Sequence, residues 1–134
     1  METNADITVY NKIYDHQKRT DVWNRTVLLG VHKYLNANAT QVNNEERRQD
    51  NGIFRVPASC PQYGFFLPER EYESVAHPEQ FWTFRPEDII VFGVCELEIN
   101  GVSTLEANHI RPWKITSVSD NRRGTTQHIR ARAQ

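Results

Sequence analysis

The sequence has few of the residues that mark an enzyme or a metal centre. Its two cysteines, Cys60 and Cys95, have a spacing that fits neither a disulfide framework nor a zinc site. It contains no glycine-rich phosphate loop, no serine nucleophile elbow and no paired metal-binding motif. The five histidines are far apart along the chain, so only folding could bring them together. We therefore expect no catalytic site, no metal and no cofactor, and free thiols in a reducing compartment.

Long apolar runs are also missing. No stretch approaches the length needed to cross a bilayer, and the first six residues are polar and acidic where a secretion signal would be basic and then apolar. The 134 residues carry 16 Lys and Arg against 17 Asp and Glu, a net charge of -1. Such a chain has no overall attraction for nucleic acid or for an anionic membrane. The sequence predicts a soluble protein made in the cytoplasm, without membrane contact.

Charge is unevenly distributed in the last third of the chain. Residues 87–106 include five acidic residues and no Lys or Arg. From residue 111 onward, six basic residues accompany a single acid, Asp120. This polarity suits copies of one chain that pack side by side, the acidic flank of one against the basic flank of the next.

Short runs of β-branched and aromatic residues, separated by turn residues, predict an all-β fold. The dipeptide Asn100-Gly101 is the strongest local hairpin signal, and no segment has a convincing amphipathic helical pattern. The expected form is a small β-barrel or sandwich with long extended loops, one domain over residues 1–134. The predicted strands are Ile7–Tyr10, Asp21–Leu35, Gly52–Val56, Phe81–Phe84, Ile89–Phe92, Val94–Ile99 and Val102–Leu105, with a closing hairpin from Trp113 to Ala131.

The segment Asp21–Leu35 is compatible with a helix or a strand. Asp21 would cap a helix, but several β-branched residues and the central Gly30 favour a bent strand. Gly30 would then mark a bulge or a barrel corner. Strict alternation along this strand would place Val31 on one face and Leu28 on the other.

Two stretches are expected to be long loops inserted in the domain. Residues 36–51 are almost devoid of apolar side chains, and a loop of that length in a small domain is usually functional or disordered. Their run of four charges consists of Glu45, Glu46, Arg47 and Arg48. Residues 57–80 contain prolines that prevent regular structure and aromatics that need burial, on the chain's own barrel or on a neighbouring subunit. These aromatics are Tyr63, Phe65, Phe66 and Tyr72.

The closing hairpin turns at a polar, basic tip. Asn121 and Gly124 both tolerate positive φ, so the turn can be a bulged or longer loop. Two adjacent guanidinium groups on an exposed tip repel each other and would gain from a carboxylate or phosphate on another molecule. The alternative is that they are simply solvated turn residues. The candidate interaction residues are the four charges and Tyr63, Phe65 and Phe66 named above, together with Asp120, Asn121, Arg122, Arg123 and Arg130.

Two other functions are alternatives. Cys60 could be a nucleophile with His128 as its base, although a half-buried structural thiol is the more common role. An oligonucleotide-binding barrel would stack bases on strand aromatics and meet phosphates with the arginines of the closing hairpin. Against it stand the pI of about 6.5 and the fact that strand aromatics are more often core residues.

One motif of the closing hairpin, Ile115–Gly124 followed by His128, resembles a group of small virion proteins of tailed bacteriophages of Gram-positive hosts. Their genes lie among the head and head-tail joining genes, and they are described as minor capsid or head-closure (stopper) proteins. Such proteins often carry an aromatic residue after the final histidine, where this chain has Ile129. The likeness extends, over less than half of the chain in all, to Ile7–Tyr14, Trp23–Val31 and Pro86–Gly93.

The resemblance implies a structural β-barrel subunit of a homo-oligomeric ring, a hexamer or a dodecamer, in the virion neck. The ring would contact the portal and adaptor proteins on the head side and the tail terminator or tail tube on the tail side. It would close the DNA channel and could contact packaged DNA non-specifically. Residues 36–51 would be the gating or adaptor-docking loop, and Arg122 and Arg123 would form salt bridges between subunits or proteins. A tail terminator or another neck protein is a related alternative.

Overall fold

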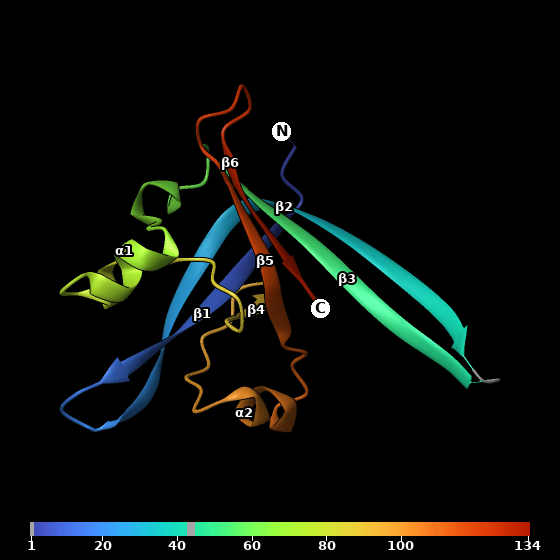
Figure 1. Ribbon diagram of the computed structural model, residues 1–134, viewed down its shortest axis with the longest axis horizontal. Helices are drawn as coiled ribbons and strands as arrows, with labels where there is room; N and C mark the ends of the chain where they lie inside the picture. The colour runs from blue at the N-terminus through green and yellow to red at the C-terminus, as the bar shows by residue number, and fades with distance from the viewer. Residues whose placement is uncertain (1, 43–44) are drawn as a thin grey trace.

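Six strands form a closed antiparallel barrel in the computed structural model, in the order β1-β2-β3-β6-β5-β4 (Figure 1). The structure describes residues 2–42 and 45–134, and for residues 36–42 and 45–50 it describes the backbone alone. The all-β prediction is confirmed, and the form is a barrel. The strands are β1 (Ala5–Asp15), β2 (Thr20–Val42), β3 (Glu45–Pro57), β4 (Ile89–Phe92), β5 (Trp113–Asn121) and β6 (His128–Ala133).

The bulge predicted at Gly30 is present in β2. Ala5 pairs with Val31 and Ile7 with Leu28, so β2 contains one residue more than β1 between these pairs. Gly30 has a φ of 74°, which glycine adopts without steric cost. Because the extra residue resets the alternation, Leu28 and Val31 both point inward and are fully buried. The prediction that they lie on opposite faces is therefore wrong.

Strands β2 and β3 continue well beyond the barrel. They pair from Asn36 with Asn51 to Val42 with Glu45, so the long loop predicted over residues 36–51 is wrong for all but Asn43 and Asn44, which lie outside the described residues. The polar sequence carried no strand pattern, but the hydrogen bonds of a ladder join backbone groups and do not require apolar side chains. We call residues 36–42 and 45–51 the ribbon. By the usual rise of ~3.4 Å per residue, it is about 24 Å long.

The ribbon leaves the barrel where its neighbouring strands end. The β1–β2 pairing begins at Val31, and the β3–β6 pairing ends at Gly52. Within the described residues, neither edge of the ribbon pairs with a third strand. Figure 1 shows it running away from the other strands.

Three predicted strands are not strands: Phe81–Phe84, Val94–Ile99 and Val102–Leu105. Phe81–Phe84 contains one isolated bridge, at Trp82, because the backbone N–H and C=O of Thr83 bond to the side chain of Asn11 (3.2 and 2.7 Å). Val94–Ile99 is irregular, and the predicted hairpin at Asn100-Gly101 is wrong, because Gly101 instead precedes a helix, α2 (Val102–Ala107). The chain leaves the sheet at Gly93, whose φ is 77°.

The prediction that prolines prevent regular structure in residues 57–80 is wrong, because Pro68 precedes a helix, α1 (Glu69–Ser74), and does not interrupt one. The segment also contains the 3₁₀ turns Tyr63–Phe65 and Pro78–Gln80. The aromatics of the segment are buried mainly on the chain's own barrel. Phe66 packs on Trp82 with ring centroids 5.0 Å apart, and Trp82 packs equally closely on Phe84. The indole N–H of Trp82 donates to the carbonyl of Gln62 at 2.7 Å, so its polar group is satisfied in the core.

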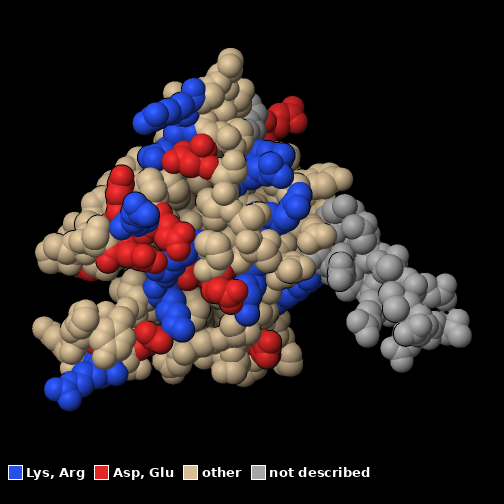
Figure 2. All heavy atoms as spheres, viewed as in Figure 1, with Lys and Arg blue, Asp and Glu red and all other residues tan. Residues whose placement is uncertain are grey.

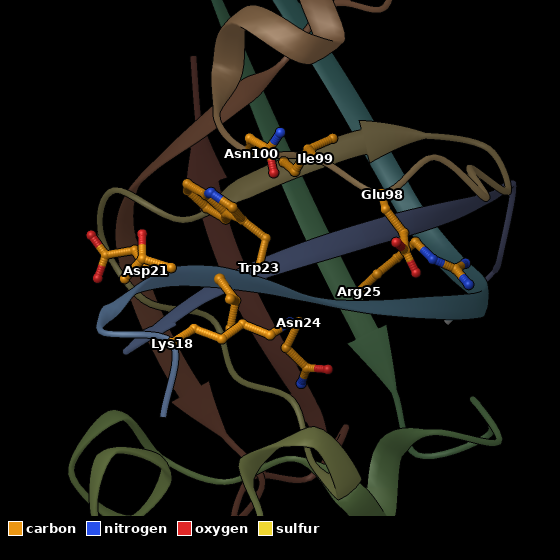
Figure 3. A pocket seen from close by; sticks show the side chains of 10 residues that line it. Lys18, Asp21, Trp23, Asn24, Arg25, Glu98, Ile99 and Asn100 are labelled. Atoms are coloured by element: carbon orange, nitrogen blue, oxygen red, sulfur yellow. The ribbon is translucent and has the colours of Figure 1, made fainter. Parts of the chain in front are cut away.

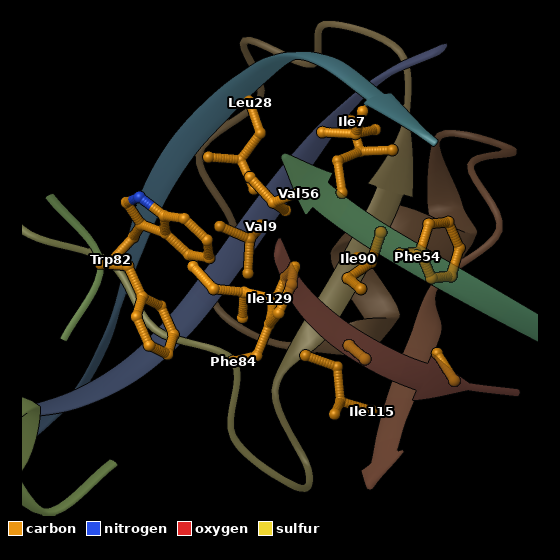
Figure 4. Packing of buried hydrophobic residues seen from close by; sticks show 14 of the residues in the cluster. Ile7, Val9, Leu28, Phe54, Val56, Trp82, Phe84, Ile90, Ile115 and Ile129 are labelled. Carbon is orange, nitrogen blue, oxygen red and sulfur yellow. The ribbon is translucent and has the colours of Figure 1, made fainter. Parts of the chain in front are cut away.

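Apolar residues form two cores on either side of the barrel wall. The inner core gathers side chains from all six strands, closed by Trp82 and Phe84 (Figure 4). The outer core lies under α2 and the segment before it, and its buried members are Tyr10, Ile89, Val91, Cys95, Ile99 and Leu105. The short strand β4 therefore packs on both faces, as its uninterrupted apolar sequence predicts.

A buried ionic network ties the turn before β4 to β1. Asp88 is 2% exposed, and its carboxylate accepts hydrogen bonds from Asn11 Nδ2 (2.8 Å) and Arg85 Nε (3.1 Å). Arg85 also donates to the carbonyl of Lys12 and forms an ion pair with Glu73 at 3.4 Å. Burial raises the pKa of the Asp88 carboxyl group, and the hydrogen bonds and charge of these donors offset only part of that rise.

Replacement of Asp88 should be among the most destabilising single changes. Asp88→Ala leaves the guanidinium of Arg85 mostly buried without its main partner, and we expect the free energy of unfolding to fall by about 3–5 kcal/mol. Urea denaturation followed by tryptophan fluorescence measures it. Asp88→Asn, which keeps the shape and one acceptor, should cost less. Equal unfolding midpoints for Asp88→Ala and the unmodified chain would show that the network is dispensable.

Candidate interaction surfaces

The tip of the β5–β6 hairpin holds an internal ion pair. Arg122 Nε lies 2.9 Å from Asp120 Oδ1, and Arg122 Nη2 lies 2.8 Å from Oδ2, a bidentate arrangement. The guanidinium also lies 5.0 Å from the ring centroid of Phe66. The hydrogen bonds from Arg122 hold the pKa of Asp120 below its ordinary value. Arg122 thus has a partner within its own chain, whereas Arg123 has no ion pair in the described part of the molecule.

A hollow of about 700 Å³ lies beside this tip. It brings together four of the predicted interaction residues, Tyr63, Asp120, Arg122 and Arg123, and adds Pro68, Glu71 and Gln127. The hydroxyl of Tyr63 is buried and has no hydrogen-bond partner in the described residues, and burial raises its pKa. The lining combines two arginines, Arg122 and Arg123, with two carboxylates, Glu71 and Asp120. The hollow is therefore not a simple anion-binding site.

The remaining predicted residues are dispersed. Phe65 is 54% exposed, whereas Phe66 is a core residue at 4%. Asn121 contacts His128 Nε2 at 3.2 Å. Glu45, Glu46, Arg47 and Arg48 belong to β3, but their side chains lie outside the described part of the structure.

Arg130 lies on the outer wall of the barrel, away from the hairpin hollow. With Arg132, Ser117, Val118 and Ser119 it lines a shallow depression of about 160 Å³. Arg130 pairs across the sheet with Arg55 of β3, a residue that sequence analysis did not select. In β6, Ile129, Ala131 and Ala133 are buried. Because side chains alternate along a strand, Arg130 and Arg132 lie together on the outside, and the sequence alternation alone could have indicated this. We call Arg55, Arg130 and Arg132 the basic strip.

Cys60 and His128 do not form a nucleophile and base pair. The thiol of Cys60 is 3% exposed and lies 3.4 Å from Gln62 Oε1, and burial raises its pKa. Both ring nitrogens of His128 already have partners, Thr126 at 2.8 Å and Asn121. A protonated, buried thiol is a packing group. Among the described residues, no three His, Cys, Asp or Glu side chains are grouped as a metal site requires.

A second hollow, of about 630 Å³, lies between β2 and the residues that precede α2 (Figure 3). Trp23 points toward Ile99 and Asn100 there, with Arg25 and Glu98 to one side. Its lining carries both charges, from Lys18, Asp21, Arg25 and Glu98, and includes no histidine or cysteine. Such a mixed lining provides contacts of both charges for another molecule.

Residues 2–134 match a family described as a family of unknown function (DUF6751), and the chain belongs to that family. The match covers nearly the whole chain, so the barrel, the ribbon and the hairpin tip all lie within the region that defines the family. No curated protein and no solved structure matches the chain. In the described residues, no helix has the length and apolar character to span a bilayer.

The ion pair at the hairpin tip can be tested by titration. Arg122→Gln removes the main donor to Asp120, so the pKa of Asp120 should rise toward its ordinary value. In the unmodified chain, this pair stabilises the fold above the unfolded pKa of Asp120, and the stabilisation is lost as the pH falls through the folded pKa. In Arg122→Gln this pH-dependent stabilisation should be absent. Carbon-13 NMR of the carboxyl group measures the pKa. Arg123→Gln is the matched control, and a shift as large as that of Arg122→Gln would refute the assignment.

Proposed function

We propose that this member of the DUF6751 family is a structural protein of tailed phage particles, a subunit of the neck ring that joins the portal and adaptor complex to the tail and closes the DNA channel. The observation that carries the proposal is the ribbon, because a protruding two-stranded ribbon with two unpaired edges is suited to contacts with other chains.

The physical argument concerns the stability of the ribbon. A lone two-stranded hairpin is marginally stable in water, since it buries little apolar surface. Its free edges also offer unpaired N–H and C=O groups to other chains. A protein that keeps about 24 Å of such structure gains most when another chain, from a second copy or from a neighbouring component, completes it. The polar sequence of residues 36–51 suits a wet interface or a water-filled channel.

The barrel provides the fixed base that such a ribbon requires. β2 pairs with β1 as far as Val31, β3 pairs with β6 as far as Gly52, and both strands continue into the ribbon without a break. The direction of the ribbon is therefore set by the pairing of β2 with β1 and of β3 with β6. In a ring of such barrels, each copy would present its ribbon in the same orientation, either to a neighbour or to the channel.

The sequence resemblance supports the same conclusion. Its motifs fall on the barrel, in β1, in β2 before the ribbon, in β4 with the turn before it, and in β5 with the hairpin tip. The ribbon itself lies outside these motifs. A common barrel with a divergent projection is what we expect of neck subunits that meet different portal, adaptor or tail proteins.

Localisation in particles tests the function directly. In the phage that encodes the chain, antibody-gold labelling of purified virions should mark the head–tail junction. Disruption of the gene should yield heads that package DNA but do not acquire tails. Mass spectrometry of the virions provides the independent control for incorporation. Absence from virions, or labelling at the far end of the tail tube, would contradict the proposal.

The role of the ribbon can be separated from that of the barrel. A variant that joins Leu35 to Gly52 through Asn-Gly replaces the ribbon with a tight type I′ turn and keeps every barrel pairing. We expect a folded barrel, checked by circular dichroism and thermal unfolding, that fails to restore infectious particles to the gene-disrupted phage.

Asn38→Ser, which keeps the full ribbon, is the matched control and should restore them. A short-ribbon variant that produces normal tailed particles would show that the ribbon does not join the protein to its neighbours.

A further inference from the structure

The basic strip places like charges side by side without an acidic partner. Arg55 and Arg130 are directly opposite on β3 and β6, and Arg132 follows two residues along β6. Like charges at opposed positions destabilise a sheet. None of the three pairs with an acidic side chain in the described residues, and Arg55 contacts only His32 Nδ1, at 3.4 Å. Lys and Arg side chains gather where β6 and β3 cross the face seen in Figure 2.

An acidic counterpart lies on the segment that follows β4. Between Val94 and Ile99 exposure alternates: Val94, Glu96 and Glu98 are exposed, and Cys95 and Ile99 are buried. We call Glu96 and Glu98 the acidic strip. Neither has an ion pair in the described part of the molecule.

The acidic strip is held rigidly against the barrel. The N–H of Cys95 donates to Thr8 Oγ1 at 2.9 Å, and the hydroxyl of Tyr10 donates to the carbonyl of Leu97 at 2.6 Å. Arg25 Nη1 donates to the carbonyl of Cys95 at 3.0 Å. These bonds keep the backbone of the segment on β1 and β2. Both glutamates are exposed, and Glu98 also lines the second hollow together with Arg25.

The two strips lie on opposite walls. In the closed order β1-β2-β3-β6-β5-β4, β6 is three positions from β1 in either direction. The acidic strip covers β1, and two of the three residues of the basic strip are on β6. One copy therefore cannot bring its own strips together.

Their spacing is also complementary. Arg130 and Arg132 are two residues apart on β6, which in a strand corresponds to ~6.6–6.8 Å. Glu96 and Glu98 are also two residues apart, and both are exposed. An exposed apolar group accompanies each strip: Val94 is 57% exposed beside the glutamates, and Tyr34 is 54% exposed. Tyr34 pairs with Ile53, which in turn pairs with Arg132.

From these features we infer that the acidic strip of one copy binds the basic strip of the next, with Glu96 and Glu98 facing Arg130 and Arg132. The contact joins two different surfaces of identical chains, so it repeats from copy to copy and closes into a ring when the rotation between copies permits. The inference rests on the proposed function in one respect, since a neck ring requires lateral contacts.

A second copy fits the basic strip better than nucleic acid does. The chain has a net charge of -1, so a polyanion gains nothing from the molecule as a whole. Nucleic acid would also leave the acidic strip without a partner, whereas a second copy uses both strips. Ion pairs of this kind determine which surfaces meet and how fast, more than how tightly they bind.

Charge exchange tests the contact in purified, full-length protein. We expect the unmodified chain to self-associate in analytical ultracentrifugation at low salt, with association weakened at high salt. Arg130→Glu with Arg132→Glu, and separately Glu96→Arg with Glu98→Arg, should each weaken it at least about tenfold. An equimolar mixture of the two variants, and a chain with all four changes, should recover it. Arg19→Glu with Arg70→Glu, at two exposed positions outside both strips, is the charge-matched control for the arginine variant and should associate normally.

Several outcomes would overturn the inference: an unmodified chain that stays monomeric, charge-reversed variants that associate normally, or a mixture that does not recover association. Loss of single-stranded oligonucleotide binding in the arginine variant, with self-association unchanged, would assign the basic strip to nucleic acid instead. Rings that persist in all variants would leave the neck function intact and refute only this contact, whereas the function itself is tested by labelling of virions.

Discussion

The pairing of β4 with β1 is the interaction on which the structure depends, because it closes the barrel. β4 has four residues, and its partners in β1 run from Ile7 to Tyr10. Closure removes the free edges that a six-stranded sheet would otherwise expose. It also places Ile90 in the inner core and Ile89 and Val91 in the outer core. The chain after β4 must therefore cover an apolar outer wall, which is why residues 94–107 fold back over β1 instead of forming another strand.

This constraint explains what could be predicted from the sequence. The uninterrupted apolar run of β4, the turn-rich closing hairpin and the central Gly30 each carry a local signal that tertiary packing supports. The Asn-Gly dipeptide before α2 carried a hairpin signal that tertiary packing overrode, because its flanking residues were needed to cover the outer core. The ribbon was missed for a different reason. Its order comes from a backbone ladder continued from two barrel strands, and such a ladder leaves no apolar pattern in the sequence.

The candidate site was predicted in part. Asp120, Arg122 and Arg123 were selected from their chemistry, but the sequence did not indicate that Tyr63 would join them at the hairpin tip. The sequence could not show that Asp120 would engage one of the two arginines, since that depends on the turn geometry. It also could not pair Arg55 with Arg130, because residues 75 positions apart become neighbours only through the β3–β6 register. The acidic and basic flanks were visible as composition. Only the strand order places Glu96 and Glu98 on the wall opposite Arg130 and Arg132, whereas Glu87 and Lys114 of the same two flanks form an ion pair within the chain at 3.4 Å.

The continuity of β2 and β3 from barrel to ribbon has a mechanical consequence. A force along the ribbon acts parallel to both strands, so it loads the hydrogen bonds of the β1–β2 and β3–β6 ladders in shear, many at once, and does not unzip them singly. The barrel can thus bear tension at its projection without opening.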